Sequence, residues 1–486
     1  MLPTQDNKAQ RDDLTFDDGL TRAAPSAVGI DAGALEAFLD DVQAAGLELH
    51  GLMLHRDGEV AAEGWWWPYR AERPRIMHSV AKSFTACAIG QAVEEGLLRL
   101  DDKVISFFPE FLPDVVDEKL AAMTVEDLLT MRAGHAGETS GSLWRGIKTS
   151  WIAEFFRIPI VHQPGSAYVY TSAASYMLSA ILTKVTGQRL HDYLKPRLFE
   201  PLGIVDEHWD IGPDGLNPGG NGLTCRLVDI LKLGILHAQK GVWDGKRLLT
   251  EDWVEQATRA HGDAPYGYHW VVLEEGGYAA IGVFVQMVIV FPDHNATLAI
   301  NAAMEESKQV RPLIAKHFPA VFRGAGTAAA DARLKVRLAN LATPLPVVSA
   351  LSKLPKQISE VPFWAKPNPL GITLFRFDFQ KDRCTFHLSD ANGSYWVAAG
   401  LGGWIEGHTE MPGSDLHHGY DLKPARVVAS ARWLDQRTLE MTWIFVETAF
   451  RDTVIARFGE SGDVLLDRSV NVNTAALNHP TIVGRR

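Results

Sequence analysis

Apolar residues at helical spacing predict a buried helix in the N-terminal part of the chain. Between Met77 and Gly96, four apolar residues recur at every fourth position: Val80, Phe84, Ala88 and Ala92. This spacing places them on one face of a helix, and a glycine commonly ends such a helix. Ser79 stands at the start of the predicted helix.

Other apolar patterns predict a mixture of helices and strands up to about residue 320. Asp57-Gly58, between two apolar runs, is typical of a hairpin turn, and the segment after Pro164-Gly165 alternates like a short strand. The remaining elements that we expect are helices over 31–45, 124–131, 172–187 and 227–236, and strands over 49–55, 59–62, 276–291 and 296–301.

The C-terminal part has the pattern of an antiparallel β-domain. At least five segments have the composition of strands, and Asn392-Gly393 predicts a hairpin between two of them. We expect a barrel or a sandwich whose inward aromatic residues fill a core rather than a ligand cavity. This domain would cover a cleft of the preceding domain or form a subunit contact.

These patterns divide the chain into four segments. We expect an N-terminal arm over 1–28, an α+β domain over 29–325, a connecting segment over 326–355 that contains several prolines and lysines, and the β-rich domain over 356–486. A chain of 486 residues is long enough for two domains.

Composition narrows the classes of partner. The net charge of −12 argues against nucleic acid or an anionic membrane, and no apolar run approaches the roughly 20 residues of a membrane span. The first residues lack the apolar core of a secretory signal, which predicts a cytoplasmic location. Three widely spaced cysteines suit a reducing compartment and form no metal-ligand spacing: Cys87, Cys225 and Cys384.

The strongest candidate for chemistry is the pair Ser79 and Lys82. Three positions apart, they lie on one face of the predicted helix. A lysine in the first helical turn opposes the helix dipole, and its apolar neighbours shield it from water, so both effects favour the neutral amine. A serine beside such a base can act as a covalent nucleophile. Ser79 could equally be a helix N-cap, because the Ser-x-x-Lys spacing occurs about once by chance in a chain this long.

Other polar residues are candidates for the same site. Tyr170 and Ser172 lie at a predicted strand-to-helix junction, where side chains can project into a cleft, although a buried tyrosine and an N-cap would look the same. His135, in a glycine-bounded loop, could line a cleft or simply be solvated. Gly282, inside a predicted strand, indicates a bulge or a close backbone approach.

Taken in order, Ser79 with Lys82, Tyr170 and the strand run over 276–291 resemble the serine β-lactamase and penicillin-binding superfamily. The resemblance covers roughly residues 30–320 and is strongest to the branch with class C β-lactamases, esterases, D-aminopeptidases and 6-aminohexanoate-dimer hydrolases. It implies a β-lactamase-like fold, with an antiparallel sheet flanked by helices and an all-helical subdomain.

The resemblance also implies residue roles. Ser79 would be the nucleophile, Lys82 its base partner, and Tyr170 the group that protonates the leaving group. The oxyanion hole would consist of the backbone N–H groups of Ser79 and Val283. Four further residues are candidates for the substrate pocket: Ser172, His135, Gly282 and Gln286.

Three departures from the family pattern bear on the substrate. Ser172 stands where an asparagine is usual, Val285 where a glycine is common, and Ala280 where β-lactamases carry a basic residue that helps to hold the substrate carboxylate. The missing basic residue makes β-lactams poor candidate substrates.

The sequence therefore predicts a serine hydrolase that acts through an acyl-enzyme on a small ester or a non-standard peptide-like amide. No metal or organic cofactor is implied. The same residues would also serve a sensor that is acylated without turnover, or an acyltransferase. The acyl group, the leaving group and the oligomeric state stay open.

Overall fold

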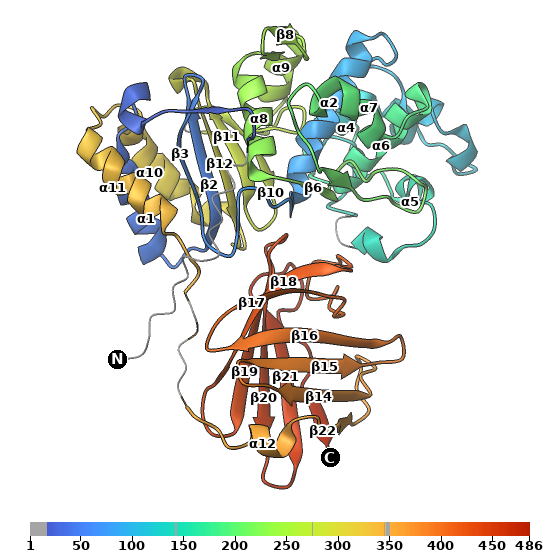
Figure 1. The fold of residues 1–486 in the computed structure, drawn as a ribbon. Helices are drawn as coiled ribbons and strands as arrows, with labels where there is room; N and C mark the ends of the chain where they lie inside the picture. Colours follow the sequence, from blue (N-terminus) through green and yellow to red (C-terminus); the bar gives the residue numbers. More distant parts are fainter. Residues whose placement is uncertain (1–16, 141–142, 275, 345, 347–349) are drawn as a thin grey trace.

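Two domains follow one another along the chain in the computed structural model, which describes residues 17–486 except 141–142, 275, 345 and 347–349. Figure 1 shows a mixed α+β domain at the top and a β-barrel below it. We call residues 17–341 the hydrolase-like domain and residues 355–486 the barrel domain. The predicted α+β class and the C-terminal antiparallel β-domain are both confirmed.

The hydrolase-like domain is built on a sheet that has seven strands among the described residues. The central strand is β12, which pairs antiparallel with β2 on one side and with β11 on the other. The strand order is β1 (Thr21–Arg22), β3 (Glu59–Trp65), β2 (Leu49–Arg56), β12 (Ala296–Ala302), β11 (Gln286–Phe291), β10 (Tyr278–Gly282) and β9 (Val271–Val272). Smaller pairings join β4 (Arg75–Ile76), β6 (Leu223–Cys225) and β5 (His208–Trp209), and β7 (Val242–Trp243) with β8 (Lys246–Arg247).

Helices cover both faces of this sheet. The first and the last two helices of the domain pack on one face through a shared apolar core, and α8 packs on the other. Gly234 allows α8 to lie close to the sheet, because a Cβ there would come within 2.6 Å of side-chain atoms of Val288 and Thr297. The helices are α1 (Ala32–Ala44), α2 (Ala81–Glu94), α3 (Glu118–Ala122), α4 (Val125–Leu129), α5 (Trp151–Arg157), α6 (Ser172–Thr186), α7 (Leu190–Leu194), α8 (Leu227–Ala238), α9 (Glu251–Thr258), α10 (Arg311–Val321) and α11 (Ala328–Ala339).

The predicted boundary at residue 325 is wrong. Helix α11 begins inside the predicted connecting segment 326–355, and its residues Ala330, Leu334 and Leu338 are buried in the core of the hydrolase-like domain. Their spacing of four residues places them on one helical face, which packs against α1 and β3. The connection between the domains is therefore shorter than predicted.

One further prediction needs correction. The segment after Gly165 is not a strand but irregular backbone, because the amide of Val169 binds the carbonyl of Met131 in a loop and no neighbouring strand pairs with it among the described residues. Residues 1–16 of the predicted arm over 1–28 lie outside the described residues. Its described part is tied down, since β1 pairs with β3 and extends the sheet.

The barrel domain settles the choice between barrel and sandwich. Nine of its ten described strands form a closed ring, because β16 pairs with β18 as well as with β15, and β17 adds to the edge of β18. The predicted hairpin at Asn392-Gly393 joins β15 to β16. After the short helix α12 (Pro355–Ile358), the strands are β13 (Phe363–Ala365), β14 (Leu374–Phe379), β15 (Arg383–Ser389), β16 (Ser394–Leu401), β17 (Ile405–Thr409), β18 (Ala425–Trp433), β19 (Thr438–Phe445), β20 (Arg451–Phe458), β21 (Asp463–Val470) and β22 (Ile482–Arg485).

Aromatic side chains fill most of the barrel interior, as expected from the sequence. Phe375, Phe377 and Trp443 are completely buried there. A cavity of about 250 Å³ nevertheless remains between Phe386, Trp443 and Arg468. The aromatic core therefore does not occupy the whole interior.

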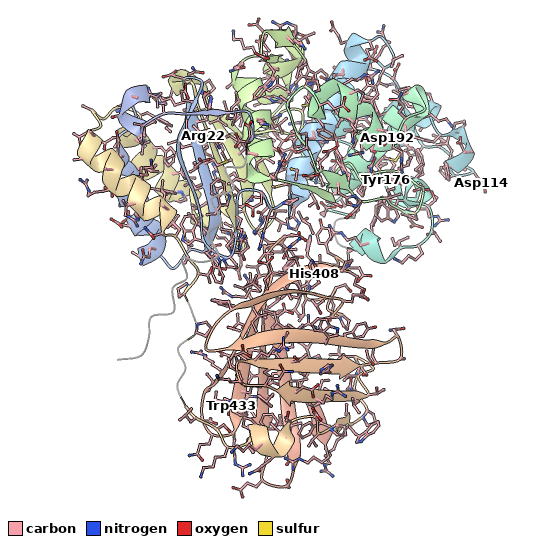
Figure 2. The ribbon with its side chains drawn as sticks, in the orientation of Figure 1. Arg22, Asp114, Tyr176, Asp192, His408 and Trp433 are labelled. Atoms are coloured by element: carbon pink, nitrogen blue, oxygen red, sulfur yellow. The ribbon has the colours of Figure 1, made fainter. Side chains whose placement is uncertain are left out.

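The two domains meet through one end of the barrel. In Figure 2, His408 marks the end of the barrel nearest to the hydrolase-like domain and Trp433 the opposite end. Ile76, Phe284 and Ala303 of the hydrolase-like domain belong to the apolar core of the barrel. No helix in the described part of the chain is long and apolar enough to cross a membrane.

The placement of α11 predicts an asymmetric response to truncation of its side chains. Leu334→Ala should lower the free energy of unfolding by about 2–5 kcal/mol, because it leaves a cavity in the core. Val336→Ala, whose side chain is 64% exposed, should change it by less than about 0.5 kcal/mol. Urea unfolding of both variants measures the difference, and equal effects would contradict the packing of α11 on the sheet.

Candidate active site

Ser79 lies in a single turn of 3-10 helix, His78–Val80, directly before α2. Its hydroxyl does not cap the helix: no side-chain cap is made at the start of this turn or of α2 within the described structure. Ser79 Oγ instead accepts a hydrogen bond of 3.1 Å from Lys82 Nζ. The side chain is half-buried and can still be reached from solvent.

Lys82 is the polar centre of the site. Its side chain is buried, and Nζ donates to three oxygens that come from three separate segments. These oxygens are Ser79 Oγ at 3.1 Å, Ser172 Oγ at 3.0 Å and the carbonyl oxygen of Gly220 at 2.9 Å. When Lys82 is protonated, its three N–H donors thus meet three acceptors, which makes burial of the ammonium group tolerable.

Burial lowers the pKa of Lys82 to about 7. The carboxylate of Glu138 opposes this shift and raises the pKa, whereas the positive charge of Arg145 lowers it further. Near pH 7 a substantial fraction of Lys82 is therefore the neutral amine, which can accept a proton from a hydroxyl.

Tyr170 and Ser172 approach the lysine from the start of α6. Thr171 rather than Ser172 is the N-cap of this helix, and Ser172 Oγ is left to accept from Lys82. The centroid of the Tyr170 ring lies 4.8 Å from Lys82 Nζ. Burial raises the pKa of Tyr170, although a hydrogen bond with Ser79 opposes the shift. Tyr170 is therefore protonated near pH 7.

The end of β10 lies directly against the Ser79 turn. A Cβ at Gly282 would come within 2.5 Å of the Met77 carbonyl oxygen and 3.2 Å of Ser79 N, so only glycine permits this approach. The close backbone approach expected at Gly282 is thus present. Val283 follows at once, so its backbone lies one residue from this contact. Val285, two residues further on, has φ of 67°, a left-handed conformation that glycine adopts more readily than valine.

Two predicted pocket residues lie elsewhere. His135 is completely buried, packs edge-on against Phe155 and has no hydrogen-bond partner for either ring nitrogen among the described residues. Gln286 is also completely buried, where it accepts from Arg75 and donates to the carbonyls of Phe284 and Ala302. Gln286 therefore braces the β10–β11 turn, and neither side chain reaches the surface of the site.

Sequence reasoning missed two groups that contact the site. Gly220 lies in a glycine-rich loop, Pro218-Gly219-Gly220-Asn221-Gly222, whose sequence gives no signal for a contact with Lys82. The neighbouring position must be glycine, because a Cβ at Gly219 would come within 2.5 Å of the Ser175 carbonyl oxygen. Glu138 accepts from the backbone N–H of Ser172 at 3.1 Å with both carboxylate oxygens. A lone glutamate in a loop offers no sequence signal for this contact.

Comparison with known proteins identifies the class. The family model described as Beta-lactamase matches residues 34–316, more than half of the chain. The chain belongs to this family, as its sequence indicated. The fold of its N-terminal domain is therefore that of the β-lactamase family.

Individual relatives have low sequence identity to this chain and match only part of it. The lovastatin esterase of Penicillium rubens is 28% identical over 164 residues, which cover 29% of this chain and 41% of the relative. Esterase EstB of Burkholderia gladioli is 29% identical over 210 residues, which cover 37% of this chain and 53% of the relative. The chain thus spans about half of the length of the curated relatives that it matches.

The structural comparison supports the fold alone. A Bacillus anthracis protein described as a 6-aminohexanoate-dimer hydrolase superposes with a TM-score of 0.52 at 16% identity. The superposition covers 62% of this chain and 87% of the other.

The environment of Lys82 predicts the pH dependence of ester cleavage. If neutral Lys82 is the base for Ser79, kcat/KM should fall about tenfold per pH unit below about pH 7 and level off above it. Glu138→Gln removes the charge that raises the pKa of Lys82, so the midpoint should move to lower pH. The test is kcat/KM for a p-nitrophenyl ester between pH 5 and 9 in both proteins. A midpoint that stays in place or rises in Glu138→Gln would contradict this electrostatic coupling.

Proposed function

We propose that the protein is a serine hydrolase that cleaves a small ester or a peptide-like amide through an acyl-enzyme on Ser79. The observation that carries the proposal is the contact of 3.1 Å between Ser79 Oγ and a buried lysine with a pKa of about 7. A serine within hydrogen-bond reach of a base that titrates near neutral pH is the arrangement required for covalent catalysis.

The proposed acylation begins with transfer of the Ser79 hydroxyl proton to neutral Lys82. Ser79 Oγ forms a bond to the carbonyl carbon, and the carbonyl electron pair moves onto its oxygen. The backbone N–H groups of Ser79 and Val283 would bind this oxyanion, and each such donor typically contributes about 3–4 kcal/mol. The close approach of Gly282 to Ser79 supports this pairing.

Departure of the leaving group breaks the bond between it and the carbonyl carbon. Tyr170 holds its proton near pH 7, because burial raises its pKa, and it hydrogen bonds to Ser79. We assign to it the proton that the leaving group takes. Lys82 then passes the proton that it took from Ser79 to Tyr170, which restores both groups. Water attacks the acyl carbon and gives a proton to Lys82, the bond between this carbon and Ser79 Oγ breaks, and Lys82 returns the proton to Ser79 Oγ as the acid leaves.

Two side chains favour an uncharged substrate. Ala280, at the position where β-lactamases carry a basic residue, is buried and offers no cation to a substrate carboxylate. Ser172 is bound to Lys82 and to the carboxylate of Glu138, so it is less available to a substrate than the usual asparagine. Two relatives are named as esterases, which supports an ester as the substrate.

The nucleophile can be tested by removing one oxygen atom. Ser79→Ala should lower kcat for p-nitrophenyl esters by at least about three orders of magnitude without unfolding the protein. Intact mass spectrometry during turnover should show a transient acyl adduct in the wild type and none in the variant. Near-normal turnover by folded Ser79→Ala would refute the proposed function, and a persistent adduct without product would favour a sensor.

The two proton carriers can be separated by the leaving group. A p-nitrophenolate departs as an anion, whereas an amine must be protonated first. Tyr170→Phe should therefore impair cleavage of an amide much more than that of the matched p-nitrophenyl ester, and Lys82→Ala should impair both severely. Measured values of kcat/KM for both substrates decide the assignment. If Tyr170→Phe lowers kcat/KM equally for the amide and the ester, the tyrosine is the base for Ser79 and the roles are reversed.

A further inference from the structure

Two strained residues flank the proposed oxyanion hole. His78 precedes Ser79 with φ of 49°, and Phe284 follows Val283 with φ of 63°. Residues other than glycine rarely adopt this left-handed conformation, and they keep it only when their surroundings hold them in place. The Ser79 N–H belongs to the peptide unit that follows His78, so the backbone at His78 sets the direction in which this donor points.

Gln286 and Met304 of the hydrolase-like domain bind the Phe284 carbonyl, but the rings of both strained residues pack against the barrel domain. The His78 ring lies 5.5 Å from that of Tyr420 and 6.5 Å from that of Phe450, measured between centroids. The Phe284 ring lies 5.5 Å from those of His418 and Phe450. The rings of His78 and Phe284 also pack against each other, with centroids 5.4 Å apart, and each residue is 1% exposed. One aromatic cluster therefore spans both flanks of the hole.

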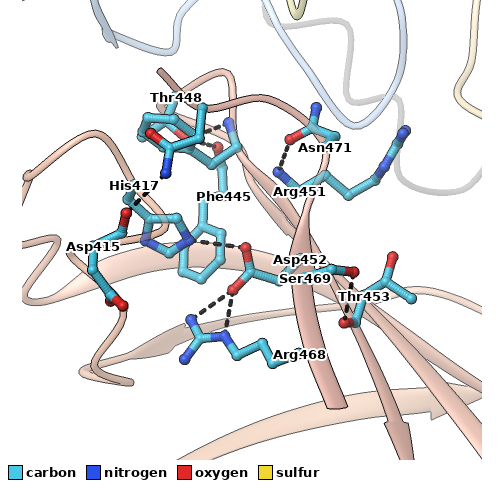
Figure 3. Close-up of polar contacts among 12 residues, drawn as sticks. Asp415, His417, Phe445, Thr448, Arg451, Asp452, Thr453, Arg468, Ser469 and Asn471 are labelled. Atoms are coloured by element: carbon cyan, nitrogen blue, oxygen red, sulfur yellow. Dashed lines mark hydrogen bonds and ion pairs between the residues drawn. The ribbon is translucent and has the colours of Figure 1, made fainter. Parts of the chain in front are cut away.

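Phe450 is itself fixed by a buried polar network, which Figure 3 shows. The ring of His417 stacks on Phe450 with centroids 5.0 Å apart. Asp452 accepts from His417 at 2.9 Å and from Arg468 at 2.7 Å. Burial alone would raise the pKa of Asp452, but Arg468 and His417 lower it, so the carboxylate stays charged. Its hydrogen bond holds His417, which stacks on Phe450, in one position.

Tyr420 is fixed from the other side. The Arg145 guanidinium lies 3.7 Å from the centroid of its ring and donates to the backbone carbonyl of His418. The hydroxyl of Tyr420 lies 3.5 Å from His78 Nδ1. The contact at this distance is weak, so packing of the ring rather than this hydrogen bond carries most of the support.

We propose that the barrel domain positions the active site. Tyr420 and Phe450 hold His78 and Phe284 in their left-handed conformations, which aims the amide of Ser79 at the substrate oxyanion and fixes the turn that carries the amide of Val283. Both are positioning residues that do not touch the substrate. This inference rests on the proposed acyl-enzyme mechanism and adds to it that the hydrolase-like domain needs the barrel for transition-state stabilisation.

The test compares an ester with its thionoester analogue, in which sulfur replaces the carbonyl oxygen. Sulfur fits an oxyanion hole poorly. The ratio of kcat/KM for the ester to kcat/KM for the thionoester therefore reports how well the hole is formed. Any inactive fraction of the enzyme cancels in the ratio. Tyr420→Leu and Phe450→Leu should each lower the ratio at least about tenfold, as expected when an oxyanion donor is misaligned. The full-length protein is used throughout.

Matched controls separate positioning from stability. Phe386→Leu truncates an equally buried aromatic residue of the barrel core whose ring contacts are with Phe375, Phe377 and Trp443. It should leave the ratio within about twofold of the wild type at a comparable loss of thermal stability. Tyr420→Phe keeps the ring and should preserve the ratio as well.

The outcomes distinguish this inference from the proposed function. If Ser79 is essential but Phe450→Leu and Tyr420→Leu leave the ratio unchanged, positioning by the barrel is refuted and the acyl-enzyme mechanism stands. If Phe386→Leu lowers the ratio as much as they do, the effect is one of general stability and the inference fails. Turnover without Ser79 would refute the proposed function itself.

Discussion

Burial of the Lys82 side chain is the constraint on which the site depends. Removing an ammonium group from water is costly unless its donors are bound, and Lys82 is 1% exposed. Its donors reach the turn before α2, the start of α6 and the loop at Gly220. The lysine therefore fixes where three distant segments meet. The same burial lowers the pKa of its amine to about 7, so the group that organises the site can also accept a proton in it.

This convergence requires close contact between backbones. Gly219 and Gly282 stand where a Cβ would come within 2.5 Å of a carbonyl oxygen, in the first case beside α6 and in the second beside the Ser79 turn. The barrel completes the enclosure, because its aromatic residues pack against His78 and Phe284 on either side of the proposed oxyanion hole. The second domain thus contacts the chain immediately beside the nucleophile.

Local patterns in the sequence determined most elements of the fold. The helix around 79–96, the hairpin at Asp57-Gly58 and the hairpin at Asn392-Gly393 follow from residues that act within a few positions of one another. The pairing of Ser79 with Lys82 is local too, because one helical turn separates them. Local reasoning failed for the segment after Gly165, since a strand exists only where another strand pairs with it.

The rest of the site was decided by the tertiary structure. Ser172, Gly220 and Glu138 come from loops and helix starts far from Lys82 in the sequence, and such contacts leave no periodic trace in a single chain. The same holds for the contact of Tyr420 with His78, which joins residues 342 positions apart. The sequence by itself determined the identity of the nucleophile candidate and the lysine beside it. Only the packing of both domains decided how far that lysine is dehydrated and what holds the backbone around the serine, because dehydration and strain depend on neighbours brought together in space.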